Sequence, residues 1–174
     1  MIEKIAKHYA GMYHKGQFRR NSELPYIVHP ENVVNYMKQF GVEDEDSLAI
    51  AWLHDTIEDT SLTYNRIKSV FGRNIADGVY LLTRNVDREE YKRRLSFAPE
   101  NIRMIKLCDT LDNITTLECL SSEGIMRKVD DCKDYYIPMA EELCPWIAKQ
   151  MKKYISNFIP PRVNNPQLAA VESL

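Results

Sequence analysis

The chain has 174 residues, of which 44% are apolar, and its 23 Lys+Arg against 25 Asp+Glu leave a formal net charge of −2. A chain of this length can bury enough apolar surface for one compact domain without disulfide staples. The near-neutral charge argues against binding to duplex nucleic acid or an anionic membrane, because such surfaces concentrate Lys and Arg. The sequence contains no run of about 18 apolar residues, which is the length that would predict a membrane-spanning helix. A small anionic ligand remains compatible with this composition.

The N-terminal segment interleaves charged and apolar residues and lacks the continuous hydrophobic region of a secretory signal, so we expect a cytoplasmic protein. The four cysteines contain no C-x-x-C pair and fall in segments with helical periodicity. We interpret them as buried thiols rather than as disulfide partners or zinc ligands. They are Cys108, Cys119, Cys132 and Cys144.

Apolar residues recur at helical spacing along almost the whole chain, beginning at Ile2, and a strand pattern is hard to find. Residues 15–29 break this periodicity with Gly, Asn, Ser and Pro, which predicts a loop. Pro30 suits the first turn of a second helix, because its missing N–H has no helical partner there in any case. That helix should run to Phe40 and stop at Gly41.

The most apolar segment, residues 48–53, follows an acidic first turn over residues 43–46, which favours a third helix. Six successive apolar residues on a helix imply burial on all sides. Further helices are expected over residues 62–71, 74–82, 99–120 and 123–158, the last split or kinked at Pro138 and Pro145. We therefore predict an all-α fold: one domain over residues 1–158, packed as a helical bundle around a buried central helix, with an extended tail over 159–174. Trp52 and Trp146 are predicted core residues.

Four polar residues follow this apolar run directly: His54, Asp55, Glu58 and Asp59. On a helix, His54 and Glu58 lie one turn apart, as do Asp55 and Asp59, so the four side chains would share one patch. Three carboxylates and an imidazole beside the most hydrophobic segment need compensation, since buried charge normally pairs or binds a metal. A divalent cation would supply it, although a solvated helix end with free acids explains the same pattern.

Two more segments carry similar chemistry. His29 lies between an extended segment and a helix start, where the backbone sets its direction, although a lone loop histidine is usually a surface residue. Asp109 interrupts an apolar helix face one turn before Asn113. Lys106 could simply pair with Asp109, so neither segment alone identifies a site.

Together these segments resemble the HD-domain metal-dependent phosphohydrolases, and specifically the alarmone hydrolase branch of the RelA/SpoT family with its small stand-alone relatives. The likeness runs from about His14 to Leu117. Four motifs stand in family order, over residues 14–20 (HKGQFRR), 25–30 (PYIVHP), 53–60 (LHDTIEDT) and 106–113 (KLCDTLDN).

The resemblance implies one metal ion held by His29, His54, Asp55 and Asp109, and in this group the ion is usually manganese (Mn2+). Two imidazoles and two carboxylates also suit an octahedral cation better than zinc. Glu58 and Asp59 are implied to flank the attacking water. The residues expected to bind substrate, either by resemblance or because a basic group or a neighbouring ring suits a nucleotide, are Arg19, Arg20, Lys15, Tyr26, Lys106, Asn113 and Thr116.

The implied activity removes the 3′-pyrophosphate from guanosine tetra- or pentaphosphate (ppGpp or pppGpp), so the expected partner is a small guanine nucleotide. The last motif departs from the family, since Thr110 and Thr115 stand where a basic residue is common. The loop before His29 is also one residue longer. Two alternatives stay open: an HD-type phosphatase acting on another nucleotide (a nucleoside phosphate, NADPH, or a pyrophosphorylated adenosine or tRNA end), and a non-catalytic nucleotide-binding or antitoxin-like module.

Overall fold

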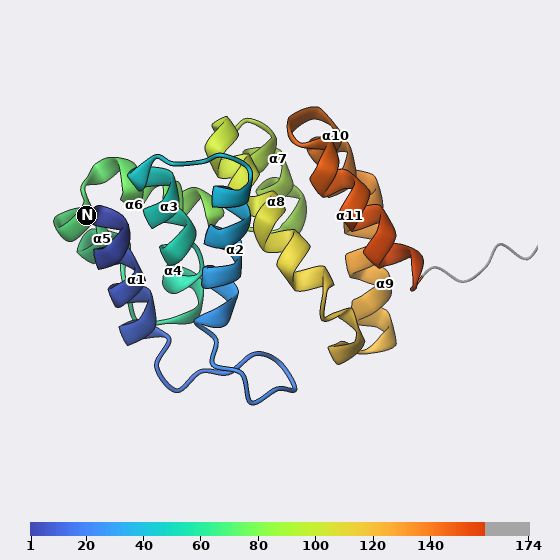
Figure 1. Cartoon of the computed structure of the whole chain (residues 1–174), viewed down its shortest axis with the longest axis horizontal. Coiled ribbons are helices and arrows are strands. Elements are labelled where there is room, and N and C mark those ends of the chain that lie inside the picture. The colour runs from blue at the N-terminus through green and yellow to red at the C-terminus, as the bar shows by residue number, and fades with distance from the viewer. Residues whose placement is uncertain (159–174) are drawn as a thin grey trace, which may run out of the picture.

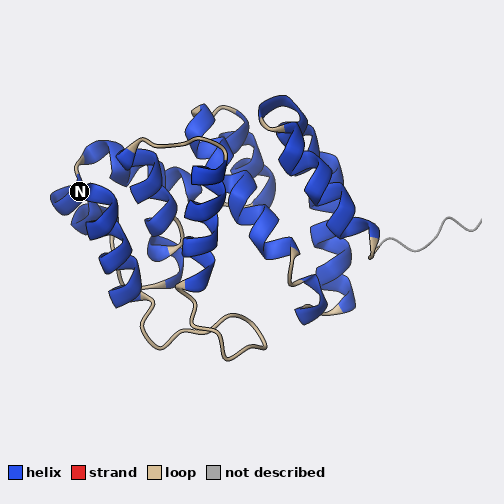
Figure 2. Cartoon of the chain, viewed as in Figure 1, coloured by secondary structure: helices blue, strands red, loops and turns tan. Residues whose placement is uncertain are grey.

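The computed structural model describes residues 1–158, whose regular elements are all helices (Figures 1 and 2). Within this range no β-strand forms, and Phe18 and Pro25 make an isolated β-bridge in the loop after the first helix. The α-helices are α1 (Ile2–Tyr13), α2 (Val28–Gln39), α3 (Glu45–Leu53), α4 (Thr56–Asp59), α5 (Tyr64–Phe71), α6 (Arg73–Leu82), α7 (Arg88–Ser96), α8 (Glu100–Ile114), α9 (Ser122–Asp131), α10 (Ile137–Leu143) and α11 (Pro145–Ser156). The predicted all-α fold is confirmed, while the predicted tail over 159–174 lies outside the described residues.

Helix α3 is the buried centre of the N-terminal half. The side chain of Asp44 caps it by accepting a hydrogen bond from the Ser47 backbone N–H at 2.8 Å. Every residue from Ser47 to Leu53 is buried, because α3 packs against α1, α2, α6 and α8. The prediction of a central helix buried on all sides is confirmed.

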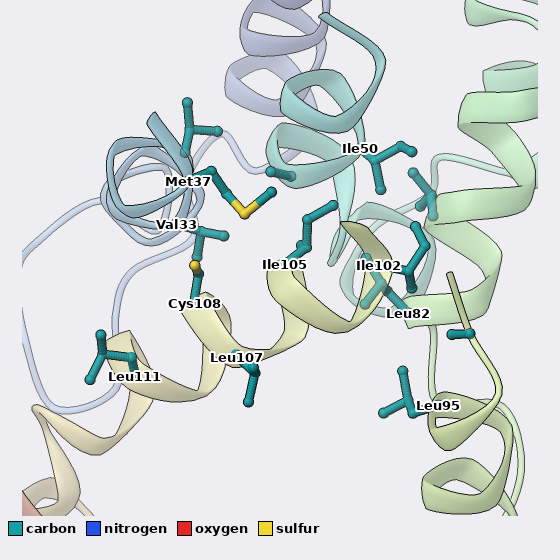
Figure 3. Close-up of a cluster of buried hydrophobic side chains, with 14 of the residues drawn as sticks. Val33, Met37, Ile50, Leu82, Leu95, Ile102, Ile105, Leu107, Cys108 and Leu111 are labelled. Carbon is teal, nitrogen blue, oxygen red and sulfur yellow. The ribbon is translucent and has the colours of Figure 1, made fainter. Parts of the chain in front are cut away.

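Helix α8 crosses this bundle and carries the second half of the core. Figure 3 shows Ile105 and Cys108 of α8 beside Val33 and Met37 of α2, and all four side chains are fully buried. Burying an aliphatic side chain of this size stabilises the fold by about 1.5–3 kcal/mol. The packing of α8 on α2 and α3 fixes the relative positions of the polar residues that these elements also carry.

Two predicted helix limits were wrong. Helix α2 begins at Val28, two residues before Pro30, so His29 lies in the first helical turn rather than before it. Helix α8 ends at Ile114 and a 3-10 turn, η1 (Leu117–Cys119), follows it. The hydroxyl of Thr115 donates to the Asp112 backbone carbonyl at 2.7 Å, so a side-chain hydrogen bond satisfies one of the carbonyl groups in the last turn of the helix.

The C-terminal third is interrupted near both of the prolines expected to split or kink it. Pro145 begins α11 after a break at Cys144, as expected, but α9 passes into α10 through a π-helical turn, η2 (Cys132–Tyr136). Pro138 comes just after that turn, as the second residue of α10. A helix that the sequence did not predict, α7, forms in the charged stretch after Arg84, with Asp87 as its N-cap.

Two predictions about buried side chains were only half right. Trp52 is buried, but Trp146 is 43% exposed and packs its ring against Phe40 at the surface. All four cysteines are free thiols within the described residues; Cys108 and Cys132 are buried, and the other two are half-buried. Among the described helices, none combines the length and the apolarity needed to cross a membrane.

Candidate metal centre and adjoining cavities

Four side chains from three parts of the chain meet at one point. The Nε2 atom of His29 lies 3.2 Å from Nε2 of His54, 3.4 Å from Oδ2 of Asp55 and 3.1 Å from Oδ1 of Asp109. The Nε2 atom of His54 lies 3.0 Å from Asp55 and 3.9 Å from Asp109. The structure therefore brings together the four residues that the sequence resemblance implied as metal ligands.

The segment that carries His54 and Asp55 is a turn and not the continuous helix that their spacing suggested. Helix α3 ends at Leu53 and α4 begins at Thr56. The hydroxyl of Thr56 donates to the Leu53 carbonyl at 2.7 Å, which satisfies a backbone group at the end of α3. At this turn the imidazole of His54 and the carboxylate of Asp55 approach each other, to 3.0 Å.

Each histidine is oriented by its Nδ1 atom. Nδ1 of His54 lies 2.8 Å from the Ala51 carbonyl oxygen, which can only accept, so this nitrogen carries the proton. Nδ1 of His29 lies 2.6 Å from Oδ2 of Asp112. Both Nε2 atoms then face the carboxylates of the cluster. Metal-ligating histidines show the same arrangement, with one ring nitrogen held by an oxygen and the other directed at the ion.

The charges in the cluster favour a cation at its centre. Burial lowers the pKa of His29, but hydrogen bonds to Asp109, Asp112 and Asp55 outweigh it and hold this pKa well above its usual value. Burial raises the pKa of Asp109, yet Lys106 and the histidines hold it far below its usual range. The carboxylates thus stay ionised. His29, His54 and Asp55 each offer a donor atom close enough to the others to hold a divalent metal ion. Asp109 offers a further carboxylate, 3.1 Å from Nε2 of His29.

Glu58 and Asp59 lie beside this cluster, on α4. The Tyr26 hydroxyl donates to Oδ2 of Asp55 at 2.6 Å and lies 3.3 Å from Oδ2 of Asp59. The Glu58 carboxylate accepts from the Arg84 backbone N–H at 2.8 Å. Burial and the neighbouring Asp55 raise the pKa of Asp59 above its usual value. One carboxylate is therefore held as an acceptor by a backbone donor, while the other keeps a proton more readily.

A small cavity adjoins the cluster, and a large cavity lies next to the small one. The small cavity holds about 200 Å³ and reaches Asp55, Glu58 and Asp109. Five cationic side chains also line it, namely Arg84, Arg88, Lys92, Lys106 and Lys128. The large cavity holds about 630 Å³, which is within the usual size of a small-molecule site. The two cavities are neighbours, because they share the lining residues Tyr26, Arg84, Asn113 and Lys128.

Six of the seven predicted substrate-binding residues line one of these cavities, and Lys15 does not. Lys106 lines the small cavity and donates to Asp109 at 2.7 Å, so it also makes the ion pair considered from the sequence. Lys15 is exposed on the turn after α1 and lines neither cavity. Of the seven predicted residues, five line the large cavity: Arg19, Arg20, Tyr26, Asn113 and Thr116.

Sequence reasoning did not single out Asp112 or the cations of α7 and α9. Arg88 and Lys92 lie one helical turn apart, and both contact Asp131 of α9 across the small cavity. Their spacing was a usable signal, but an alternating charged helix is usually a solvated face. Asp112 belongs to the motif over residues 106–113, three residues after Asp109, so helical spacing places its carboxylate on the same side of α8.

Comparisons with known proteins agree with this geometry. The family model described as "HD domain" matches residues 6–146. Among curated proteins, guanosine-3′,5′-bis(diphosphate) 3′-pyrophosphohydrolase from Aquifex aeolicus is 32% identical over 84% of this chain and 22% of its own length. GTP pyrophosphokinase from Myxococcus xanthus is also 32% identical, over 92% of this chain and 23% of that protein. The chain thus spans about a fifth of the length of these relatives.

A solved structure shares the fold. It is titled "A metazoan ortholog of SpoT hydrolyzes ppGpp and plays a role in starvation responses" and superposes with a TM-score of 0.78 at 22% identity. The match covers 90% of this chain and 94% of that one. At this level of identity the likeness concerns the fold, and it confirms the predicted helical bundle.

Proposed function

The chain belongs to the HD-domain family, and from that premise we propose that it is a metal-dependent phosphohydrolase that removes the 3′-pyrophosphate of guanosine tetra- or pentaphosphate. One observation carries the proposal: the cluster of His29, His54, Asp55 and Asp109 borders a small cavity lined by five basic side chains, and a cavity of nucleoside size lies next to it. The 3′-pyrophosphohydrolase name of a relative from Aquifex aeolicus supports the same substrate. The products would be GDP or GTP and pyrophosphate.

The metal we propose is Mn2+, held by the two Nε2 atoms and by carboxylate oxygens of Asp55 and Asp109. This donor set leaves coordination positions for water and suits an octahedral borderline cation. Bound there, the ion would polarise the phosphoryl group and make water more acidic. The chain's own contribution is orientation: Ala51 and Asp112 hold the imidazoles, and Tyr26 holds Asp55.

Glu58 and Asp59 are the proposed proton acceptor and donor. Glu58 lines the small cavity together with Asp55 and Asp109, which supports a role in accepting a proton from the attacking water. The pKa of Asp59 is raised above its usual value by burial and by Asp55, which is the direction that suits a proton donor. Tyr26 joins Asp59 to Asp55 and keeps the two acids at a fixed separation.

Substrate recognition divides between the two cavities. The 3′-diphosphate would occupy the small one, whose cations come from α7, α8, α9 and the segment after α6. Charge that Thr110 and Thr115 do not supply is thus supplied by Arg88, Lys92 and Lys128. The nucleoside and its 5′-phosphates would occupy the large cavity, beside Arg19 and Arg20, since guanidinium groups bind phosphate and stack on bases.

The test is hydrolysis of ppGpp by the purified chain loaded with Mn2+. We expect GDP and pyrophosphate in equal amounts, resolved by anion-exchange chromatography, and no turnover after chelation. Asp109→Asn should abolish turnover, whereas Glu118→Gln, at an exposed acid beyond the end of α8, should not. Release of phosphate from NADPH or a nucleoside monophosphate but not from ppGpp contradicts the substrate. Nucleotide binding without any turnover contradicts the activity and favours a binding module.

We further propose that residues 1–158 make up the catalytic domain and that a small guanine nucleotide is its partner. The cytoplasmic location stays a prediction from the N-terminal segment, and the lack of a duplex nucleic-acid partner stays a prediction from the net charge.

A further inference from the structure

Asp112 connects the candidate metal centre to the large cavity. Its side chain is only 5% exposed. Its Oδ2 atom lies 2.6 Å from Nδ1 of His29 and accepts from Nη2 of Arg19 at 3.0 Å. Its Oδ1 atom accepts from the Asn32 amide at 2.7 Å. One buried carboxylate therefore holds a candidate metal ligand and a cation of the nucleotide cavity at the same time.

The position of Arg19 depends on this contact. Arg19 belongs to the loop between α1 and α2, the tan segment below the bundle in Figure 2, so it is not held by the hydrogen bonds of a helix. The Arg19 side chain is 14% exposed. Its guanidinium makes a further hydrogen bond to a side chain, from Nη1 to Oδ1 of Asn113 at 3.4 Å. Since 3.4 Å is long for a hydrogen bond, Asp112 is the stronger anchor.

His29 depends on Asp112 in another way. The pair fixes which ring nitrogen faces Asp55 and Asp109, because a proton held between Nδ1 and the carboxylate leaves Nε2 for the cluster. Removing such a partner from a metal-binding histidine typically weakens metal binding by about 10–100-fold. Asn32 comes from the turn of α2 that follows His29, so the same carboxylate also fixes the start of that helix.

We propose that Asp112 is a positioning residue that couples the two halves of the site, holding His29 for the metal and Arg19 for the nucleotide. Its role in turnover rests on the proposed function, but the coupling itself concerns binding. An asparagine at this position could not replace it. The amide offers one acceptor oxygen for three donors, and it leaves the guanidinium of Arg19 without a counter-charge.

The first experiment measures Mn2+ affinity by calorimetry on the nucleotide-free protein. We expect Asp112→Asn to bind Mn2+ about 10–100-fold more weakly than wild type. Arg19→Ala should bind Mn2+ as wild type does, because Arg19 reaches the metal centre only through Asp112. Glu118→Gln serves as the matched loss of one exposed carboxylate and should change nothing. Near-ultraviolet circular dichroism confirms that each variant is folded.

The second experiment measures GDP affinity in the presence of a chelator, so that no metal contributes. Asp112→Asn and Arg19→Ala should weaken GDP binding by a similar factor, and the double variant should bind no more weakly than Arg19→Ala alone. Such a non-additive result is the signature of two residues acting as one unit. If Asp112 and Arg19 acted independently of each other, the double variant would lose GDP binding free energy equal to the sum of the two single losses.

Two outcomes overturn the coupling: wild-type Mn2+ affinity in Asp112→Asn, or a double variant whose loss of GDP affinity equals the product of the single losses. A wild-type chain that does not bind Mn2+ at all overturns the coupling together with the proposed function. If the wild type binds both ligands, the variants behave as expected and ppGpp is not hydrolysed, the activity fails while the coupling stands.

Discussion

The Nε2 atoms of His29 and His54 lie 3.2 Å apart, although 25 residues separate the two histidines along the chain. The rings meet at 67° with centroids 5.1 Å apart, so the two nitrogens point into the same space. Two nitrogen lone pairs at this distance need a proton or another cation between them. Carboxylates raise the pKa of both histidines against the effect of burial, so these imidazoles take up a proton more readily than free ones do. Metal ions and protons must therefore compete here.

This competition predicts that Mn2+ stabilises the protein more at pH 8 than at pH 6. The raised histidine pKa values stabilise the metal-free fold fully below the unfolded value of about 6.5, and this contribution is lost as the pH rises through the folded values. Metal affinity changes in the opposite direction, because the imidazoles must be deprotonated to bind. Differential scanning fluorimetry with and without Mn2+ measures the shift in Tm. A shift that is equal at both pH values, or larger at pH 6, contradicts a site built on these histidines.

The hydroxyl of Tyr26 is the next contact to test. Burial, and then Asp55, raise its pKa above the usual value, so it remains a hydrogen-bond donor at every ordinary pH. Tyr26→Phe removes the donor at 2.6 Å from Asp55 and frees that carboxylate to rotate. We expect kcat for ppGpp to fall about tenfold or more, with Mn2+ binding weakened by a comparable factor. Tyr154→Phe makes the same change on the exposed side of α11 and should leave both values unaltered. Undiminished Mn2+ affinity in Tyr26→Phe would show that Asp55 needs no support.

The cationic wall of the small cavity predicts an effect on KM rather than on folding. Lys128 lines both cavities from the exposed side of α9. Lys128→Ala should raise KM for ppGpp several-fold at low salt, and this difference should shrink as salt rises, because exposed charges are screened. Lys149→Ala removes an exposed lysine from α11, lies outside both cavities and is the matched control. A salt-independent loss shared by both variants would contradict a phosphate-binding role for Lys128.

The fold was predictable from the sequence wherever a local rule acts alone. Asp44 begins α3, and Gly41 and Gly72 follow helices in a positive-φ conformation, at 80° and 87°, as expected of helix-ending glycines. The rules failed where tertiary contacts decide. Thr115 ends α8 through a bond to a backbone carbonyl, and the apolar stripe beyond it continues into the 3-10 turn, so periodicity alone placed the helix end too late.

The site was predictable only in part, for a similar reason. Helical spacing placed His54 and Asp55 in one patch with Glu58 and Asp59. The structure brings His54 and Asp55 together through the turn after Leu53, which apolar periodicity does not reveal. The role of Asp112 depends on α2 and α8 packing side by side, and no motif within α8 says which residue of α2 will face it. Arg88 and Lys92 look like surface charges until α9 is known to cover them.

Two glycine substitutions test the packing that supports the site, and they should act in opposite directions. Gly78 of α6 faces α3, and a Cβ built there would lie 2.5 Å from Cδ1 of Ile50 and 3.1 Å from Cδ1 of Ile102. Such overpacking costs about 1–3 kcal/mol, more than the roughly 1 kcal/mol that alanine contributes as a better helix former. Gly78→Ala should therefore lower the free energy of unfolding.

Gly11 of α1 is the matched control, because a Cβ there meets no atom within 4 Å and its backbone is helical. Gly11→Ala should raise the free energy of unfolding by about 0.5–1 kcal/mol through helix propensity alone. Urea denaturation of both variants, with unchanged m-values, measures the two effects. If Gly78→Ala stabilises the protein as much as Gly11→Ala does, Ile50 can move aside, and the contact of α3 with α6 is looser than its burial indicates.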